Sequence, residues 1–212
     1  MDSVQSQRSN SHANIILVGV MGSGKSIVGR LLAHLLGFGF IDTDAEVEAR
    51  AKKSVARVFR EQGEPTFREM ERKIVMRAAG ARHHVIATGG GAVEDAEAWN
   101  ALKASGIVVW LNPPIEEVVR RMAPGPKALQ TLADRPFLED LADLTGLAPG
   151  AKGPALQHFM DDKRKRLGER LRALLGRRIA QYREADLVVE PEWELPETTA
   201  RDIANRLRAM ES

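Results

Sequence analysis

Residues 14–26 read Asn-Ile-Ile-Leu-Val-Gly-Val-Met-Gly-Ser-Gly-Lys-Ser, a short apolar run that leads directly into glycines, a lysine and a serine. The run 14–19 is rich in β-branched residues, which is typical of a buried parallel strand. Beyond the glycines, apolar residues recur at helical spacing until Gly37, where a helix is expected to end: Ile27, Val28, Leu31, Leu32, Leu35 and Leu36. The stretch therefore predicts a strand, a tight loop and a helix.

The loop between these two elements, Gly19 to Ser26, fits the pattern G-x-x-x-x-G-K-[ST] of phosphate-binding loops. Glycines let backbone N–H groups turn toward phosphates, and the helix N-terminus adds its positive dipole end. Lys25 is expected to reach the β- and γ-phosphates of ATP, and the Ser26 hydroxyl to face Mg²⁺. A glycine-rich turn without a ligand is the alternative. The predicted nucleotide contacts are Gly22, Ser23, Gly24, Lys25, Ser26 and Ile27.

Four further apolar runs are separated by segments with helical periodicity, at residues 38–41, 84–88, 107–111 and 187–189. They predict an α/β fold of three layers, in which helices cover both faces of a five-stranded parallel sheet. The stretch from Met122 to about Pro154 breaks this rhythm with Pro and Gly residues. We expect it to form a mobile helical lid, at about 123–159, with little means of packing itself.

The composition limits which classes of protein this chain can belong to. Lys and Arg number 31 against 29 Asp and Glu in 212 residues, so the net charge of +2 gives no reason to expect nucleic acid or a membrane surface as a partner. The absence of cysteine excludes disulfides and thiolate metal sites. No apolar run approaches the roughly 20 residues that span a bilayer. We expect a cytoplasmic protein with a flexible tail at 1–13 and one domain at 14–212.

Two patterns narrow the class of nucleotide-binding protein. No Asn is followed by Lys, so the Asn-Lys-x-Asp stretch usual in guanine-specific switch proteins is missing. Mechanical and transport ATPases usually carry an acidic residue after a later apolar strand, yet residues 107–111 run into Asn-Pro-Pro. A P-loop kinase that acts on a small molecule is left as the leading class.

Acidic residues follow the second predicted strand, in the sequence Phe40-Ile-Asp-Thr-Asp44. In an extended segment Asp42 and Asp44 point the same way, toward the edge where open α/β sheets bind ligands. Asp42 is then expected in the magnesium shell and Asp44 on an acceptor hydroxyl. The alternative is that Asp42 or Thr43 caps the following helix.

Two further sequence features are suited to binding an anionic molecule that would accept the phosphoryl group. Arg68 lies in the first turns of a helix led by Pro65, where it could form a bidentate pair with a carboxylate. An ion pair with Glu64 or Glu71 is the alternative. Glycines 89–91 follow the third predicted strand, where the absence of side chains lets a small substrate approach the backbone. A simple turn is the other interpretation.

Taken together, these residues resemble the shikimate kinase family: GVMGSGKS, FIDTD, GEPTFRE, ATGGG, DRPFL, RRIAQY and EADLVV occur in that order from about 14 to 189. The resemblance implies a monomeric P-loop kinase that uses ATP and Mg²⁺ to phosphorylate a hydroxyl of shikimate. The products would be shikimate 3-phosphate and ADP, in chorismate and aromatic amino acid biosynthesis.

The resemblance also implies roles for individual residues. Lys25, Asp44 and Arg135 would be catalytic, with Arg135 in the lid touching ATP, and Ser26 and Asp42 would serve the metal. Helices at about 43–79 would bind the substrate. The residues that would hold shikimate are Asp44, Arg68, Gly89, Gly90, Gly91 and Arg178.

The sequence departs from the family pattern in its lid, where residues 139–159 are surplus. Arg177 competes with Arg178 for the substrate, and Arg178 is preferred because it precedes Tyr182 by four residues. The charged run 161–166 is interpreted as a solvated helix face rather than a nucleic-acid site. A related kinase for gluconate or another polyol, and a nucleotide-binding module without turnover, are the competing functions.

Overall fold

The computed structural model describes residues 13–135, 138–148, 150–192 and 195–211. Of the expected flexible tail, only Ala13 falls within this part of the chain. The prediction of a tail at 1–12 therefore lies outside the described residues.

A five-stranded parallel sheet forms the centre of the fold, as predicted. Its strands are β1 (Asn14–Val18), β2 (Gly39–Asp42), β3 (His84–Ala87), β4 (Gly106–Leu111) and β5 (Leu187–Val189). Their order across the sheet is β2-β3-β1-β4-β5, and every pairing is parallel. Since β1 lies in the middle, the phosphate loop that follows it leaves from the centre of the sheet.

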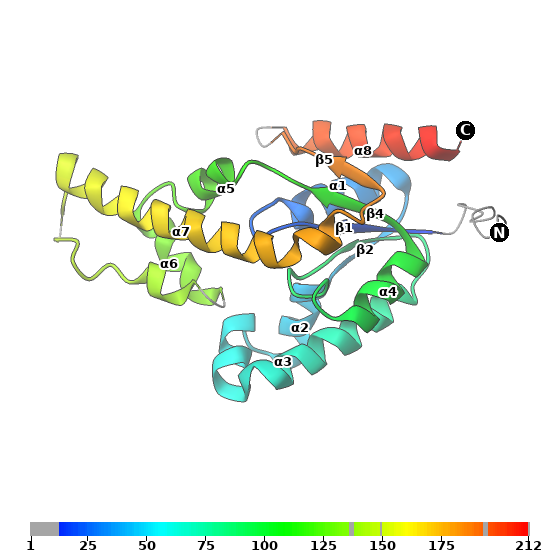
Figure 1. The fold of residues 1–212 in the computed structure, drawn as a ribbon, viewed down its shortest axis with the longest axis horizontal. Helices are drawn as coiled ribbons and strands as arrows, with labels where there is room; N and C mark the ends of the chain where they lie inside the picture. Colours follow the sequence, from blue (N-terminus) through cyan, green and yellow to red (C-terminus); the bar gives the residue numbers. More distant parts are fainter. Residues whose placement is uncertain (1–12, 136–137, 149, 193–194, 212) are drawn as a thin grey trace.

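Alternate residues of the strands face two separate apolar layers. Ile15 and Leu17 face the helices α1 (Lys25–Leu36) and α8 (Pro196–Glu211), while Ile16 and Val18 face the opposite side. That second side is covered by α3 (Val55–Ala79), α4 (Ala96–Ser105), α5 (Ile115–Met122) and α7 (Gly153–Tyr182). Figure 1 shows the resulting three layers, with α1 and α8 above the sheet.

The helices predicted between about 43 and 79 are α2 (Thr43–Ala51) and α3. They share a small apolar cluster of Val47, Val58, Phe67 and Ile74. Helix α3 is broken at Gly63, whose φ of 81° and ψ of 162° lie outside the helical region. Because the helix resumes directly afterwards, Pro65 stands near its start, where a proline is tolerated.

The predicted lid region packs far better than its sequence suggests. It contains α6 (Pro126–Gln130) and two short 3-10 helices, Thr131–Asp134 and Glu139–Ala142. Four leucines within it are at most 1% exposed, and they belong to the same apolar cluster as the sheet: Leu129, Leu132, Leu138 and Leu141. The expectation of little packing is therefore wrong: the short helices of the lid lie against one another and against α3 and α7, and their leucines join an apolar cluster shared with α7 and the sheet.

The charged run 161–166 is only partly a solvated face. Lys163 is 6% exposed, and its Nζ donates to the backbone oxygens of Asp143 at 2.6 Å and Asp140 at 3.5 Å. Arg164 Nε donates to Ala123 O at 3.0 Å, and Arg166 pairs with the Asp140 carboxylate at 2.9 Å. These basic side chains fasten the lid to the half of α7 that projects beyond the sheet in Figure 1.

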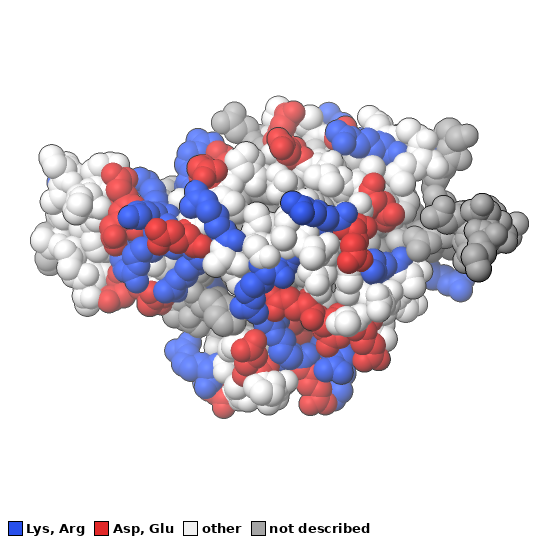
Figure 2. Space-filling model, in the orientation of Figure 1, with Lys and Arg blue, Asp and Glu red and all other residues white. Residues whose placement is uncertain are grey.

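On the face drawn in Figure 2, Lys and Arg side chains are interspersed with Asp and Glu. The small net charge is thus spread over this face rather than gathered into one basic surface. Among the described residues, no helix combines the length and the apolar character needed to cross a membrane.

Candidate active site

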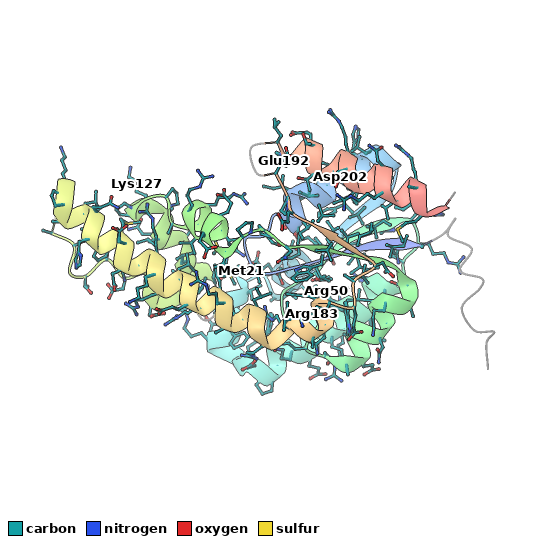
Figure 3. All side chains as sticks on the ribbon, turned by 45° about the horizontal axis from the view of Figure 1, so that its top comes forward. Met21, Arg50, Lys127, Arg183, Glu192 and Asp202 are labelled. Carbon is teal, nitrogen blue, oxygen red and sulfur yellow. The ribbon has the colours of Figure 1, made fainter. Side chains whose placement is uncertain are left out.

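A cavity of about 740 Å³ lies beside the phosphate loop. Residues after β1, β2 and β3 line it, together with side chains from α3, α5, α7 and the lid. In Figure 3, Met21 of the phosphate loop lies near the middle of the molecule, whereas Lys127 lies out at the end where α7 projects. The cavity is thus built where the carboxyl ends of the central strands meet α7, which is the usual ligand position in an open α/β sheet.

The phosphate loop adopts backbone conformations that favour glycine. Gly22 and Gly24 have φ angles of 76° and 91°. Gly24 is the N-cap of α1 and has no side chain with which to cap the helix, so no capping side chain competes with an anion for the helix N-terminus. Gly22, Gly24, Ser26 and Ile27 all line the cavity.

Lys25 is folded back onto the loop. Its Nζ donates to Gly19 O at 2.9 Å and Val20 O at 3.0 Å. Burial of the ammonium group lowers the pKa of Lys25 to about 8, and the nearby carboxylates of Asp44 and Asp42 oppose that shift. An incoming phosphate would favour the charged form, so its binding would raise this pKa again.

Asp42 caps α2, which was its alternative role, and it also lies beside Ser26 at the phosphate loop. Its Oδ1 accepts from the backbone N–H groups of Asp44 at 3.1 Å and Ala45 at 3.2 Å, which caps α2. Its Oδ2 accepts from the Ser26 hydroxyl at 2.6 Å. This places two oxygen ligands together at the phosphate loop, and Mg²⁺ typically takes one or two protein oxygens and completes its shell with phosphates and water. Nowhere in the described residues do three His, Cys, Asp or Glu side chains gather to form a metal site.

Asp44 is not in an extended segment, contrary to the expectation from sequence. The cap formed by Asp42 starts α2 at Thr43, so Asp44 lies in the first helical turn. Its carboxylate nevertheless lines the cavity. Burial raises the pKa of Asp44, and the charge of Lys25 opposes this.

Arg68 lines the cavity and also forms the ion pairs that were its alternative interpretation. Its Nη1 donates to Glu71 Oε2 at 2.8 Å and its Nη2 to Glu64 Oε1 at 3.2 Å. Glu71 is 4% exposed, and burial raises its pKa while Arg68 lowers it. Glu71 was not predicted as a site residue, although its position three residues after Arg68 on a helix was a usable signal.

Two of the three predicted glycines make room for arginines. An added Cβ at Gly90 would lie 2.5 Å from Arg178 Nη1, and one at Gly91 would overlap the Arg68 guanidinium. Both glycines line the cavity. The glycine run is therefore needed by the protein's own arginines, besides any close approach by a substrate.

Gly89 and Ser23 lie behind the cavity and are not among its lining residues. Gly89 N donates to the Thr43 hydroxyl at 2.7 Å, and a Cβ there would collide with the Asp44 carboxylate. Ser23 is fully buried, with its hydroxyl 3.5 Å from Lys25 Nζ. Both residues thus contact neighbouring groups of the site: Thr43 and Asp44 for Gly89, and Lys25 for Ser23.

Arg178 rather than Arg177 lines the cavity. The Arg178 side chain is 7% exposed and its Nε donates to Glu94 Oε1 at 2.6 Å. The Arg177 side chain is 59% exposed and donates to the other oxygen of Glu94 at 2.9 Å. One carboxylate thus holds two consecutive arginines.

Two more arginines line the cavity together with the phosphate loop. Arg135, predicted from the lid motif, is exposed and lines the cavity at the end of the 3-10 helix Thr131–Asp134. Arg121 also lines the cavity, and its Nη1 donates to Gly22 O at 3.4 Å. Sequence reasoning missed Arg121, because nothing distinguishes it from Arg120 in the pattern of α5.

Comparisons with known proteins agree with this geometry. The chain matches the family described as shikimate kinase over residues 21–208. A shikimate kinase from Persephonella marina is 34% identical over 195 residues, which is 92% of this chain and 99% of the relative. One from Nostoc punctiforme is 37% identical over 195 residues, covering 92% of this chain and 88% of that relative.

A solved structure extends the likeness to three dimensions. The shikimate kinase from Acinetobacter baumannii in complex with shikimate matches with a TM-score of 0.75 at 30% identity, covering 95% of this chain and 96% of that one. The predicted fold and the family resemblance are both confirmed. With a family match over nearly all of its described residues and a 34% identical relative that is matched over 99% of its length, the chain belongs to the shikimate kinase family.

Proposed function

We propose that the chain transfers the γ-phosphoryl group of ATP to a hydroxyl of shikimate, giving shikimate 3-phosphate and ADP, in the shikimate pathway to aromatic amino acids. The observation that carries this proposal is the single cavity that joins the phosphate loop to a cluster of Asp44, Arg68 and Arg178. Shikimate is a small carboxylate with three hydroxyls, so it requires arginines for one end and carboxylate or amide groups for the other.

At the nucleotide end, the phosphates of ATP would lie over Gly22, Gly24 and the N-terminus of α1. Lys25 would exchange its backbone acceptors, Gly19 O and Val20 O, for phosphate oxygens. Phosphoryl transfer passes through a loose transition state, so its rate depends mainly on alignment and on stabilising charge. Arg135 would add a positive charge from the lid and help exclude water from the γ-phosphoryl group.

Ser26 and Asp42 would hold the Mg²⁺ that accompanies ATP. The hydroxyl and the carboxylate are already 2.6 Å apart, and Asp42 is fixed by its hydrogen bonds to the start of α2. When bound, the metal would neutralise charge on the phosphates. Rigid placement of Asp42 limits the reorganisation that metal binding requires.

At the acceptor end, Arg68 and Arg178 would bind the shikimate carboxylate, and Asp44 would face the reacting hydroxyl. Burial keeps the pKa of Asp44 above its ordinary range, which makes it a stronger acceptor for the hydroxyl proton. Glu71, which pairs with Arg68, would keep that guanidinium in place before the acceptor binds.

A coupled assay of ADP formation tests the function. With ATP and Mg²⁺ present, we expect turnover with shikimate and background rates with gluconate and other polyols. Chelation of the metal should remove the activity. Equal rates with gluconate would favour the competing kinase, and nucleotide binding without any turnover would favour the regulatory module.

Gly90→Ala should raise the KM for shikimate by about tenfold or more, which corresponds to 1.4 kcal/mol of lost binding. The reason is that a Cβ at this position would lie 2.5 Å from Arg178 Nη1 and displace it. The KM for ATP should change less than about twofold. Gly176→Ala is the matched control, since a Cβ there meets nothing within 4 Å. Parallel increases in both KM values for Gly90→Ala would indicate general damage instead.

ATP binding should take up a proton above about pH 8. In the free protein the pKa of Lys25 is about 8, because burial outweighs the carboxylates of Asp44 and Asp42, and Arg178 and Arg135 add to the lowering. Phosphates favour the ammonium form, so binding raises this pKa. Calorimetry with Mg-ATP at pH 8.5, in two buffers of different ionisation enthalpy, should show uptake of about half a proton or more. Lys25→Met should abolish this uptake, and persistence of the uptake in that variant would exclude Lys25 as its source.

A further inference from the structure

Glu94 lies between the glycine run and α7, and the roles proposed above do not use it. Its Oε1 accepts from Arg178 Nε at 2.6 Å, and its Oε2 accepts from Arg177 Nη2 at 2.9 Å. Its own backbone N–H donates to Gly91 O at 2.9 Å, so the backbone of Glu94 is held against the glycine run. Glu94 therefore links two elements that both line the acceptor end of the cavity.

The point of contact on Arg178 determines what the rest of its guanidinium can do. A guanidinium is planar and presents its five N–H groups in a fixed fork. Since Glu94 binds the Nε edge, Nη1 and Nη2 are left for another ligand, and Nη1 is the atom that lies against Gly90. The side chain is 7% exposed, so little water is available to replace a lost partner.

We propose that Glu94 is a positioning residue for the acceptor: it fixes Arg178 so that the two terminal nitrogens form a bidentate pair with the acceptor carboxylate. This inference rests on the proposed function, in which Arg178 binds that carboxylate. The hydrogen bond that fixes Arg178 needs an oxygen acceptor at this reach, which Glu94 supplies in its ionised form. Burial raises its pKa, but the hydrogen bond from Arg178 and the charges of Arg178 and Arg177 outweigh burial and keep the pKa below its ordinary value.

If Glu94 acted only through its charge, its removal would change acceptor binding in the opposite direction. Glu94 is a negative charge near a site for an anion, so its removal would strengthen acceptor binding if orientation did not matter. If Glu94 instead positions Arg178, removal of Glu94 weakens acceptor binding. Two conservative variants separate charge from geometry: Glu94→Gln keeps the length and an oxygen acceptor but loses the charge, whereas Glu94→Asp keeps the charge but withdraws it by one methylene.

The experiment measures kcat and the KM values for shikimate and ATP in four variants. Glu94→Asp and Glu94→Ala should each raise the KM for shikimate by about tenfold or more, while Glu94→Gln should stay within about threefold of the parent protein. The KM for ATP should change less than about twofold in all of them. Arg177→Ala is the matched control: it removes the exposed partner of Glu94 but leaves the bond to Arg178, so its KM for shikimate should stay within about threefold.

A double variant completes the test. Adding Glu94→Ala to Arg178→Ala should cause no further rise in the KM for shikimate, because the group that Glu94 positions is already gone. If Arg178→Ala alone leaves this KM unchanged, the proposed acceptor site is wrong. If Arg178→Ala raises it while Glu94→Asp and Glu94→Ala do not, or if Glu94→Gln is impaired more than Glu94→Asp, the positioning role alone is overturned.

Discussion

Lys25→Ala is expected to lower kcat by about 10²–10³-fold, the range found when one group that stabilises transition-state charge is removed. The ammonium group is held at the phosphate loop by Gly19 O and Val20 O, within the cavity. It is therefore placed before the nucleotide binds, which is how charge stabilisation becomes effective. Steady-state kinetics with saturating ATP and shikimate measure the effect.

Lys73→Ala is the control, because it also removes one lysine charge and is purified in the same way. Lys73 lies on α3 with a side chain that is 70% exposed, and its partner is Glu69 one turn earlier. Such a surface pair contributes at most about 1 kcal/mol to stability. Both variants should retain cooperative thermal unfolding. A kcat for Lys25→Ala within a few-fold of the parent protein would contradict the role of this lysine.

Arg68→Ala should raise the KM for shikimate by about 30-fold or more, with little effect on the KM for ATP. Truncating one partner of a buried charged contact to a ligand costs about 2–5 kcal/mol, and each 1.4 kcal/mol is tenfold. Arg72→Ala is the matched control, one turn further along α3. Arg72 pairs with Asp95 at 2.8 Å, has a side chain 47% exposed against 25% for Arg68, and does not line the cavity. Equal effects of the two substitutions would assign Arg68 a structural role.

Part of the Arg68→Ala effect will come from Glu71, which is left buried without its partner. Burial already raises the pKa of Glu71, so removal of Arg68 pushes this carboxyl further toward its neutral form. The double variant Arg68→Ala with Glu71→Gln removes that penalty. It should recover thermal stability relative to Arg68→Ala but not the KM for shikimate.

The sequence was sufficient to predict those parts of the fold that depend on local pattern. Strands β1 to β5 coincide closely with the five apolar runs, and for β1, β3 and β4 the reason is that a buried parallel strand is apolar at nearly every position. The phosphate loop was predictable because its glycines, lysine and serine are adjacent in the chain. The packing of the lid was not, since Leu129 and Leu138 join an apolar cluster to which α7 and the sheet, distant in the chain, also contribute.

The same distinction applies to the candidate site. Asp44 was placed in an extended segment because it closely follows the second apolar run, whereas the cap formed by Asp42 starts the helix at Thr43, before Asp44. Glu94 follows a recognisable glycine run, but its partners Arg177 and Arg178 are more than 80 residues away. Such pairings become visible only when the chain is folded.

Helix α7 connects the lid with the acceptor end of the cavity. Lys163 at one point along it holds the backbone of the lid, and Arg178 at another lines the acceptor end of the cavity. At a rise of 1.5 Å per residue, these positions are about 22 Å apart along one rigid axis. If α7 tilted by about 5° around Arg178, the lid would move by about 2 Å. This is roughly the distance between the hydrogen and the acceptor oxygen in a hydrogen bond. We therefore expect occupancy of the acceptor site and closure over the nucleotide to be coupled through this helix.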